Sequence, residues 1–425
     1  MARVLVHLAV VSDVARRVSS SLEITMASRQ SSFGTARELL RVPLFVPALL
    51  AIVLAILAEA MGFSYIALLV VETIGLSPFE LGVCLTLSAL SGMLVSTIFG
   101  HLHDRKPAAW PLILSLVAKA AGFGLCAILR EPWMLWLNAA VFLGVSSASF
   151  ALLFAIARTY LEEANDAVIS SGMAALRMGG SLSWAVGPAL GAAIVTWWTI
   201  EGIYVIAGAL ASSALAVVVI CGLKAMPVSS NREPIDRSVL SSTAPIVTAL
   251  IAFHTAMFAG SNALSILVAQ DFGSATDVGL LFSLCAALEV VVMGIFVIRP
   301  AAGTNRWLLL FGFAIFAAYF ALPIFWPSLW AFYVGQLLRA IGIAIVSIVG
   351  MAYLQDLLPG RTGTAAALFG NSASAGLLLS GLATGIWAEN FGYLSLFATC
   401  GVMCLVGAAP LCFHAAISRK LNHAA

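Results

Sequence analysis

The sequence has little charge for its length. Asp, Glu, Lys and Arg make up 9% of its 425 residues, whereas soluble domains carry about 25%. So few charges cannot cover a water-facing surface, which excludes a soluble globular protein. The hydrophobic content of 62% and the mean hydropathy of +1.05 also exclude a disordered chain. A polytopic membrane protein is the class that remains.

Other features that the sequence lacks narrow the function. The net charge is only +2 and no basic block is present, which excludes a nucleic-acid binder. The seven cysteines are odd in number and all lie in apolar stretches, so we interpret them as apolar fillers and not as a disulfide framework. No P-loop, Walker lysine or dinucleotide fingerprint occurs, so we expect no cofactor and no ATP-driven pumping.

A metal site is not expected either. His101 and His103 have ligand-like spacing, but Arg105 and Lys106 stand beside them and would repel a cation. We therefore expect no metal in this protein.

Twelve apolar stretches are long enough to cross a bilayer as helices, which takes roughly 20 residues each. They cover residues 44–70, 78–99, 109–129, 133–157, 172–196, 202–223, 244–269, 278–298, 307–326, 328–351, 363–386 and 393–417. The sequence therefore predicts an all-α membrane protein with twelve transmembrane helices.

The positive charges predict the orientation of these helices. Of the 21 Lys and Arg residues, only Arg130 falls on one side, while Lys119, Arg177 and Arg339 fall inside the stretches. The remainder lie on the opposite side, together with both chain ends. By the positive-inside rule, both termini are expected in the cytoplasm, as an even number of spans also requires.

One long polar segment divides the twelve stretches into two sets of six. The predicted organisation is a cytoplasmic tail (1–42), a six-helix bundle (43–223), a cytoplasmic linker (224–243), a second six-helix bundle (244–417) and a short cytoplasmic tail (418–425). Two such halves are typical of transporters built from parallel repeats, with the substrate site between the halves near the midplane. The tetrads at 160–163 and 353–356 are a weak trace of that repeat.

The loop between the second and third stretches holds a glycine followed by an acid and a base, Gly100, Asp104 and Arg105. This loop resembles motif A of the major facilitator superfamily, which implies two pseudo-symmetric six-helix bundles and a latch that closes the cytoplasmic side. The alternative is a basic loop that merely obeys the topology rule.

The fifth stretch contains a proline between glycines, Gly187, Pro188 and Gly191. Proline removes a backbone donor and bends a helix, and glycines allow close packing. This segment resembles motif C of the same superfamily, which implies an exporter that exchanges its substrate for protons. Ordinary packing of small residues is the competing interpretation.

Further segments resemble the bacterial sugar efflux transporter family. They are residues 354–363 and 368–372, residues 177–188, and Ala287 to Glu289. The resemblance implies export of small sugars or glycosides across the bacterial inner membrane. Composition and periodicity by themselves indicate nothing about sugar.

Polar groups inside the apolar stretches are few, and each needs a partner or a task because buried charge is costly. The superfamily resemblance implies that spans 1, 4, 7 and 10 line the central cavity. It therefore places these candidates on the substrate or proton path: Glu59, Asn138, His254, Asn262, Gln336 and Arg339. Structural or coupling roles are expected for Lys119, Arg177, Glu289, Asp356, Arg361 and Asn371.

Several of these assignments have alternatives. Glu59 either pairs with Arg339 or carries a proton, and we hypothesise that it is the proton-coupled carboxylate. His254 is either a proton carrier or a histidine bonded to a neighbouring helix. Phe258, with Trp330 and Phe332, could offer an aromatic surface to a sugar ring.

Four functions are weighed. The first is a monomeric exporter of small sugars or glycosides that works by alternating access and proton antiport, and its expected partners are the sugar, protons and the lipid bilayer. The second is a proton antiporter for drugs or metabolites. A membrane enzyme would need catalytic groups gathered at one depth, which the scattered polar residues do not provide, so the protein is not expected to be an enzyme. A receptor that transports nothing is the fourth.

Overall fold

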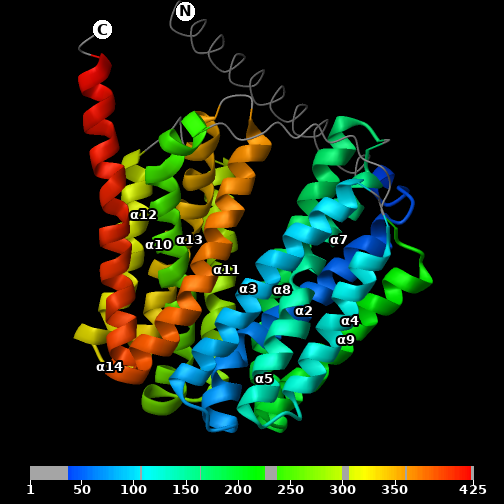
Figure 1. Cartoon of the computed structure of the whole chain (residues 1–425), viewed down its shortest axis with the longest axis horizontal. Coiled ribbons are helices and arrows are strands. Elements are labelled where there is room, and N and C mark those ends of the chain that lie inside the picture. Colours follow the sequence, from blue (N-terminus) through cyan, green and yellow to red (C-terminus); the bar gives the residue numbers. More distant parts are fainter. Residues whose placement is uncertain are drawn as a thin grey trace, which may run out of the picture.

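The computed structural model describes residues 37–105, 108–162, 164–224, 237–298, 306–358 and 361–422, and within these ranges the chain is helical with no strand. Most of the predicted tail 1–42 and of the predicted linker 224–243 lies outside the described residues. The all-α class that the apolar pattern predicts is therefore confirmed (Figure 1).

The helices fall into two bundles that lie side by side (Figure 1). The N-terminal bundle contains α2 (Phe45–Leu68), η1 (Leu69–Thr73), α3 (Pro78–Arg105), α4 (Trp110–Cys126), α5 (Pro132–Asn138), η2 (Ala139–Leu143), α6 (Gly144–Ser146), α7 (Ala148–Thr159), α8 (Asp166–Trp197) and α9 (Ile200–Ile220). The C-terminal bundle contains α10 (Arg237–Leu267), η3 (Val268–Phe272), α11 (Ala275–Ile298), α12 (Arg306–Phe325), α13 (Leu329–Leu357) and α14 (Thr362–Asn422).

The number of membrane helices depends on how two elements are counted. Ten helices in the described part of the chain are long and apolar enough to span a membrane. Helix α4 has only 17 residues, and the 61-residue α14 contains Gly392 with φ 78°, which breaks it into two runs. The twelve predicted stretches are recovered only when α4 counts as a span and α14 as two.

The bundles contact each other at one end and separate toward the end where α14 finishes (Figure 1). At the closed end, a Cβ on Gly82 of α3 would collide with the backbone of Gly385 and Gly381 in α14. A Cβ on Gly279 of α11 would likewise collide with the Pro188 carbonyl oxygen of α8. Small residues therefore let the two bundles meet backbone to backbone.

The segment predicted to bend lies within α8, which runs through Pro188 without ending. Gly187 packs against Ala60 of α2, and Gly191 packs against the ring of Tyr65. The hydroxyl of Tyr65 donates to the Pro188 carbonyl oxygen at 3.3 Å. The small residues thus hold α8 against α2 while leaving Pro188 at the contact with α11.

The two bundles repeat one turn that the sequence analysis did not identify. Helices α2 and α10 each end in a π-helical segment, η1 and η3, and the next helix begins with a capped turn. Ser77 Oγ accepts from the Glu80 N–H at 3.2 Å, and Ser274 Oγ accepts from the Asp277 N–H at 3.3 Å. Corresponding caps at corresponding places support the parallel repeat.

The predicted latch residues lie at the end of α3, on the separated side. A Cβ on Gly100 would meet nothing within 4 Å of the described residues, so this glycine makes no close approach in this conformation. Asp104 and Arg105 close the helix, but their side chains lie outside the described residues.

Candidate functional site

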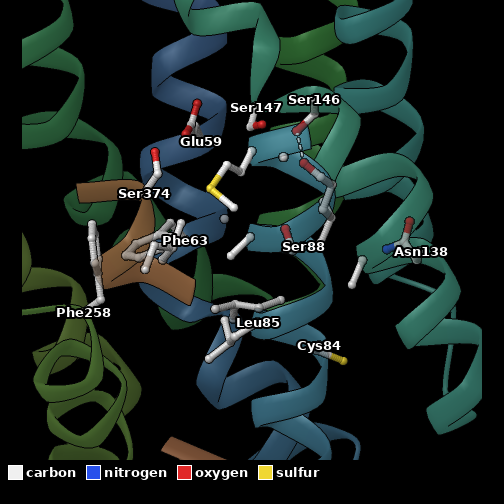
Figure 2. A pocket seen from close by; sticks show the side chains of 18 of the residues that line it. Glu59, Phe63, Cys84, Leu85, Ser88, Asn138, Ser146, Ser147, Phe258 and Ser374 are labelled. Atoms are coloured by element: carbon white, nitrogen blue, oxygen red, sulfur yellow. Dashed lines mark hydrogen bonds between the residues drawn. The ribbon is translucent and has the colours of Figure 1, made fainter. Parts of the chain in front are cut away.

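A cavity of about 590 Å³ lies between the bundles and extends into the N-terminal one (Figure 2). Helices α2, α3, α4 and α8, with the α5 to α7 segment, form most of its wall. The C-terminal bundle contributes Phe258 from α10 and Asn371, Ser374 and Leu377 from α14. A solute in this cavity would therefore touch both bundles.

Three aromatic rings line the cavity where the bundles meet. Phe63 of α2 packs edge-on against Trp184 of α8, with ring centroids 5.9 Å apart. It also packs edge-on against Phe258 of α10, at 6.0 Å. Figure 2 shows Phe63 and Phe258 side by side near Ser374. Apolar ring faces next to hydroxyl groups suit a molecule with both apolar and polar faces.

Glu59 also lines the cavity, one helical turn before Phe63 on α2 (Figure 2). Its carboxylate accepts a hydrogen bond from the Lys119 ammonium of α4 at 2.6 Å. The Lys119 side chain is 1% exposed and that of Glu59 is 37% exposed. The alternative pairing of Glu59 with Arg339 is wrong, because a lysine of the same bundle already occupies this carboxylate.

Asn138 lines the cavity at its far side, opposite Phe258 (Figure 2). Its amide nitrogen donates to the Gly122 carbonyl oxygen at 3.1 Å and to Cys126 Sγ at 3.2 Å. Its amide oxygen has no partner among the described residues. Asn371 of α14, for which the sequence predicts a structural or coupling role, also lines the cavity, from the C-terminal bundle.

Three predicted path residues do not line the cavity. His254 is bonded to the Leu250 carbonyl oxygen at 2.8 Å, Asn262 donates to Thr384 Oγ1 at 3.4 Å, and Gln336 donates to the Phe332 carbonyl oxygen at 3.0 Å. All three are buried in the C-terminal bundle. Lying on an expected cavity helix does not place a side chain on the cavity, because each helix also has faces that pack inside its own bundle.

Arg339 is the fourth path residue that lies away from the cavity. Its guanidinium donates to Ser261 Oγ at 2.7 Å and to Gln336 Oε1 at 3.3 Å. It also lies over the ring of Phe282 at 5.0 Å. No carboxylate of the described residues lies within 4 Å of it; Glu289 of α11 interacts with it only at longer range. Neutral acceptors and ring faces thus solvate this buried cation.

The remaining predicted residues lie outside the cavity wall. Arg177 is exposed on α8, Asp356 lies in the last turn of α13, and Arg361 immediately precedes α14. Of the other rings considered, Phe332 is fully buried and Trp330 is 70% exposed near the start of α13. Only Phe258 of the three proposed rings faces the cavity.

Sequence reasoning missed several residues of the cavity wall: Phe63, Trp184, Ser88, Ser147 and Ser374. Phe63 could have been found, because it follows Glu59 by four residues and so shares its helix face. The serines give no such signal, since small hydroxyl residues are common throughout membrane helices. In the described part of the chain, no group of three His, Cys, Asp or Glu residues could hold a metal ion.

Comparison with known proteins gives consistent matches. The family model of the Major Facilitator Superfamily matches residues 48–299 and 246–423. A Deinococcus radiodurans protein named as a sugar efflux transporter is 32% identical, over 84% of this chain and 94% of its own. The Escherichia coli protein "Sugar efflux transporter A" is 26% identical, over 82% and 90%.

Solved structures agree at the level of the fold. A POT family transporter in complex with a thioalcohol-conjugated peptide matches with a TM-score of 0.73 and 11% identity, covering 87% of this chain and 96% of its own. The nucleoside transporter NupG matches with a TM-score of 0.72 and 12% identity, covering 87% and 98%. At these identities the likeness concerns the architecture and not the solute.

Proposed function

Since this chain belongs to the major facilitator superfamily, we propose that it is a secondary transporter that exports small sugars or glycosides by alternating access. The superfamily is one of transporters, so the chain is a multi-pass membrane transporter and not an enzyme. The sugar substrate is inferred from the names of its relatives together with the chemistry of the cavity.

The observation that carries the proposal is the cavity wall shared by both bundles. Phe63 and Trp184 come from the N-terminal bundle and Phe258 from the C-terminal one, beside the hydroxyl of Ser374 and the amide of Asn371. Aromatic faces suit the apolar face of a sugar ring, and hydroxyls and amides can replace water around its hydroxyl groups. A solute held by both bundles responds to, and can trigger, their relative movement.

The proposed setting is the bacterial inner membrane, with both termini in the cytoplasm. The end at which Gly82 meets Gly385 is then periplasmic, and the cavity of this conformation faces the cytoplasm. The freedom of Gly100 from close contacts fits that assignment, because a cytoplasmic latch is released when the cytoplasmic side is open. Sugar would bind from the cytoplasm and leave once the bundles rock to the opposite state.

Proton antiport is the proposed driving mode, with Glu59 as the coupling carboxylate. Glu59 is exposed to the cavity and bonded to Lys119, so an entering proton and the ammonium compete for the same carboxylate. Protonation of Glu59 would release Lys119 inside the bundle and change the balance between conformations.

Counterflow in proteoliposomes tests the export proposal. Vesicles loaded with unlabelled lactose, glucose or an alkyl glycoside should take up the labelled sugar transiently, whereas a labelled cationic dye should not exchange. Empty vesicles are the control. Dye exchange without sugar exchange would contradict the proposal and favour a drug antiporter instead.

A separate measurement tests the proton. Glu59→Gln should abolish uphill, pH-driven sugar movement while leaving exchange without a pH gradient in place. Ser88→Ala is a matched control, because Ser88 lines the same cavity but cannot carry a proton. Unchanged uphill transport and unchanged pH dependence in Glu59→Gln would refute the coupling role.

A further inference from the structure

The described part of the cavity wall has a single charged side chain. Among the described residues that line it, Glu59 is charged, while the polar remainder consists of serine, threonine, asparagine, cysteine and tryptophan side chains. Arg339, the cation expected on the solute path, lies inside the C-terminal bundle instead, and so does His254. The electrostatic field at the solute is therefore determined mainly by Glu59 and by its ion-pair partner Lys119.

The charge behind Glu59 is turned away from the solute. Lys119 Nζ lies 2.6 Å from Glu59 Oε2, and the lysine side chain is 1% exposed while that of the glutamate is 37% exposed. The two charges cancel in sum but not in space, because the carboxylate is at the cavity surface and the ammonium is behind it. A solute in the cavity meets the negative end of this ion pair.

An oriented ion pair of this kind acts differently on charged and neutral solutes. Inside a protein the effective dielectric constant is lower than in water, so a carboxylate repels an anion more strongly there. Among the described residues of the wall, no cation could compensate an incoming carboxylate or phosphate. Hydroxyl groups of a neutral sugar can donate to Glu59, and an ammonium group on a sugar can do so with added attraction.

We propose that the orientation of the Glu59–Lys119 pair determines the charge class of the substrate: neutral sugars and amino sugars are accepted, and acidic sugars and sugar phosphates are rejected. This inference rests on the proposed sugar transport and adds a selectivity rule to it. Such a rule would keep phosphorylated metabolic sugars inside the cell while neutral or amino sugars leave. Glu59 is then a specificity-determining residue, and Lys119 is the residue that positions its charge.

Competition in counterflow tests the rule on the unmodified protein. Exchange of labelled lactose is measured without a pH gradient against glucose, glucosamine and glucuronate, at a pH where the glucosamine amine is protonated. Glucuronate should inhibit at least about tenfold more weakly than glucose, and glucosamine should inhibit as well as glucose or better. Because counterflow needs no proton gradient, this readout is independent of coupling.

Three variants assign the effect to the ion pair. In Glu59→Gln the buried Lys119 ammonium is left alone, so glucuronate should gain and glucosamine should lose relative to glucose. In Lys119→Met the carboxylate is left alone, so the preference for glucosamine should increase. The double variant Glu59→Gln/Lys119→Met leaves no charge among the described residues of the wall, and the three sugars should inhibit within about twofold of one another.

The double variant also controls for destabilisation of the fold in the single variants, because it removes both charges together and leaves no member of the ion pair unpaired. Equal inhibition by the three sugars in the unmodified protein would overturn the inference while leaving sugar transport intact. Persistent rejection of glucuronate by the double variant would overturn it as well, since another group would then set the selectivity. If no sugar exchanges at all, the transport proposal fails together with the inference.

Discussion

Each bundle contains a buried cation, but the two cations have different kinds of partner. In the N-terminal bundle, Lys119 has a carboxylate partner at 2.6 Å, and that partner faces the cavity. In the C-terminal bundle, Arg339 is bonded to Ser261 and Gln336 and faces ring surfaces, away from the cavity. One cation is thus paired with a carboxylate of the cavity wall, while the other is enclosed within its own bundle.

This difference shows that pseudo-symmetric bundles need not share the chemistry of the site. The backbone repeat extends to the capped turns at Ser77 and Ser274, yet most of the cavity wall belongs to the N-terminal bundle. Of the described residues of the C-terminal bundle, only Phe258 and a short face of α14 line the cavity. The repeat fixes the architecture, and the side chains decide which bundle does the binding.

The largest effect in this comparison is expected from Glu59→Gln. It leaves the Lys119 ammonium buried without a counterion, which should lower the free energy of unfolding by about 3 kcal/mol, a modest value for a broken buried pair because Glu59 is partly exposed. Denaturant unfolding in detergent measures it. The double variant Glu59→Gln/Lys119→Met should recover most of the loss; equal losses in both would show that the unpaired Lys119 ammonium is not what destabilises Glu59→Gln.

Arg339→Met should cost less, about 1 to 2 kcal/mol, because no carboxylate of the described residues lies within 4 Å of Arg339. The change removes two hydrogen bonds to neutral acceptors and weakens a longer-range attraction to Glu289. The same unfolding measurement applies, together with the affinity for sugar, which should stay within about twofold of the original value. A loss of affinity as large as that expected for the cavity variant Asn371→Leu would place Arg339 in the binding site. The two buried cations would then not differ in their relation to the solute.

Asn371→Leu and Gln336→Leu separate the cavity face from the interior of the C-terminal bundle. Asn371 lines the cavity, so its loss should weaken sugar binding about tenfold, while Gln336→Leu should change binding little. Half-saturation of counterflow measures both. The opposite order of effects would mean that the solute binds deeper in the C-terminal bundle than the cavity indicates.

The smallest effects are expected at the repeated turns. Ser77→Ala and Ser274→Ala each remove a cap at the start of a helix, so each should lower the free energy of unfolding by about 0.5 to 1 kcal/mol. Thermal unfolding of the two variants under identical conditions is the measurement. Clearly unequal shifts would show that the backbone repeat is not an energetic repeat.

The fold could be predicted from the sequence because several independent features, each extending over many residues, indicate the same architecture. Apolar stretches of membrane length, the division at the polar linker and the loop around Gly100 all pointed to the same superfamily, and the family match confirms it. The helix ends differ more from the prediction. The sequence predicts a loop between residues 386 and 393, whereas in the structure the two helical runs of α14 are joined at Gly392, a single residue with positive φ.

The site was harder to predict from the same residues. Glu59 and Asn138 lie on the cavity, but His254, Asn262, Gln336 and Arg339 do not. The pairing of Glu59 with Lys119 was missed because the two residues are 60 positions apart on helices that are not consecutive. Hydropathy specifies that a helix crosses the membrane, yet it does not specify the rotation of that helix about its own axis.

The sequence by itself determined that this chain is a bundle of membrane helices with two related halves. In lipid the backbone must satisfy its own hydrogen bonds, and apolar stretches of about 20 residues do so as helices. Tertiary packing alone decided which carboxylate meets which cation, which side chains face the solute, and which end of the molecule is closed. These outcomes depend on helix rotation and on close contacts between small residues, such as Gly82 with Gly385. Such contacts join residues that are distant in sequence, so no local pattern records them.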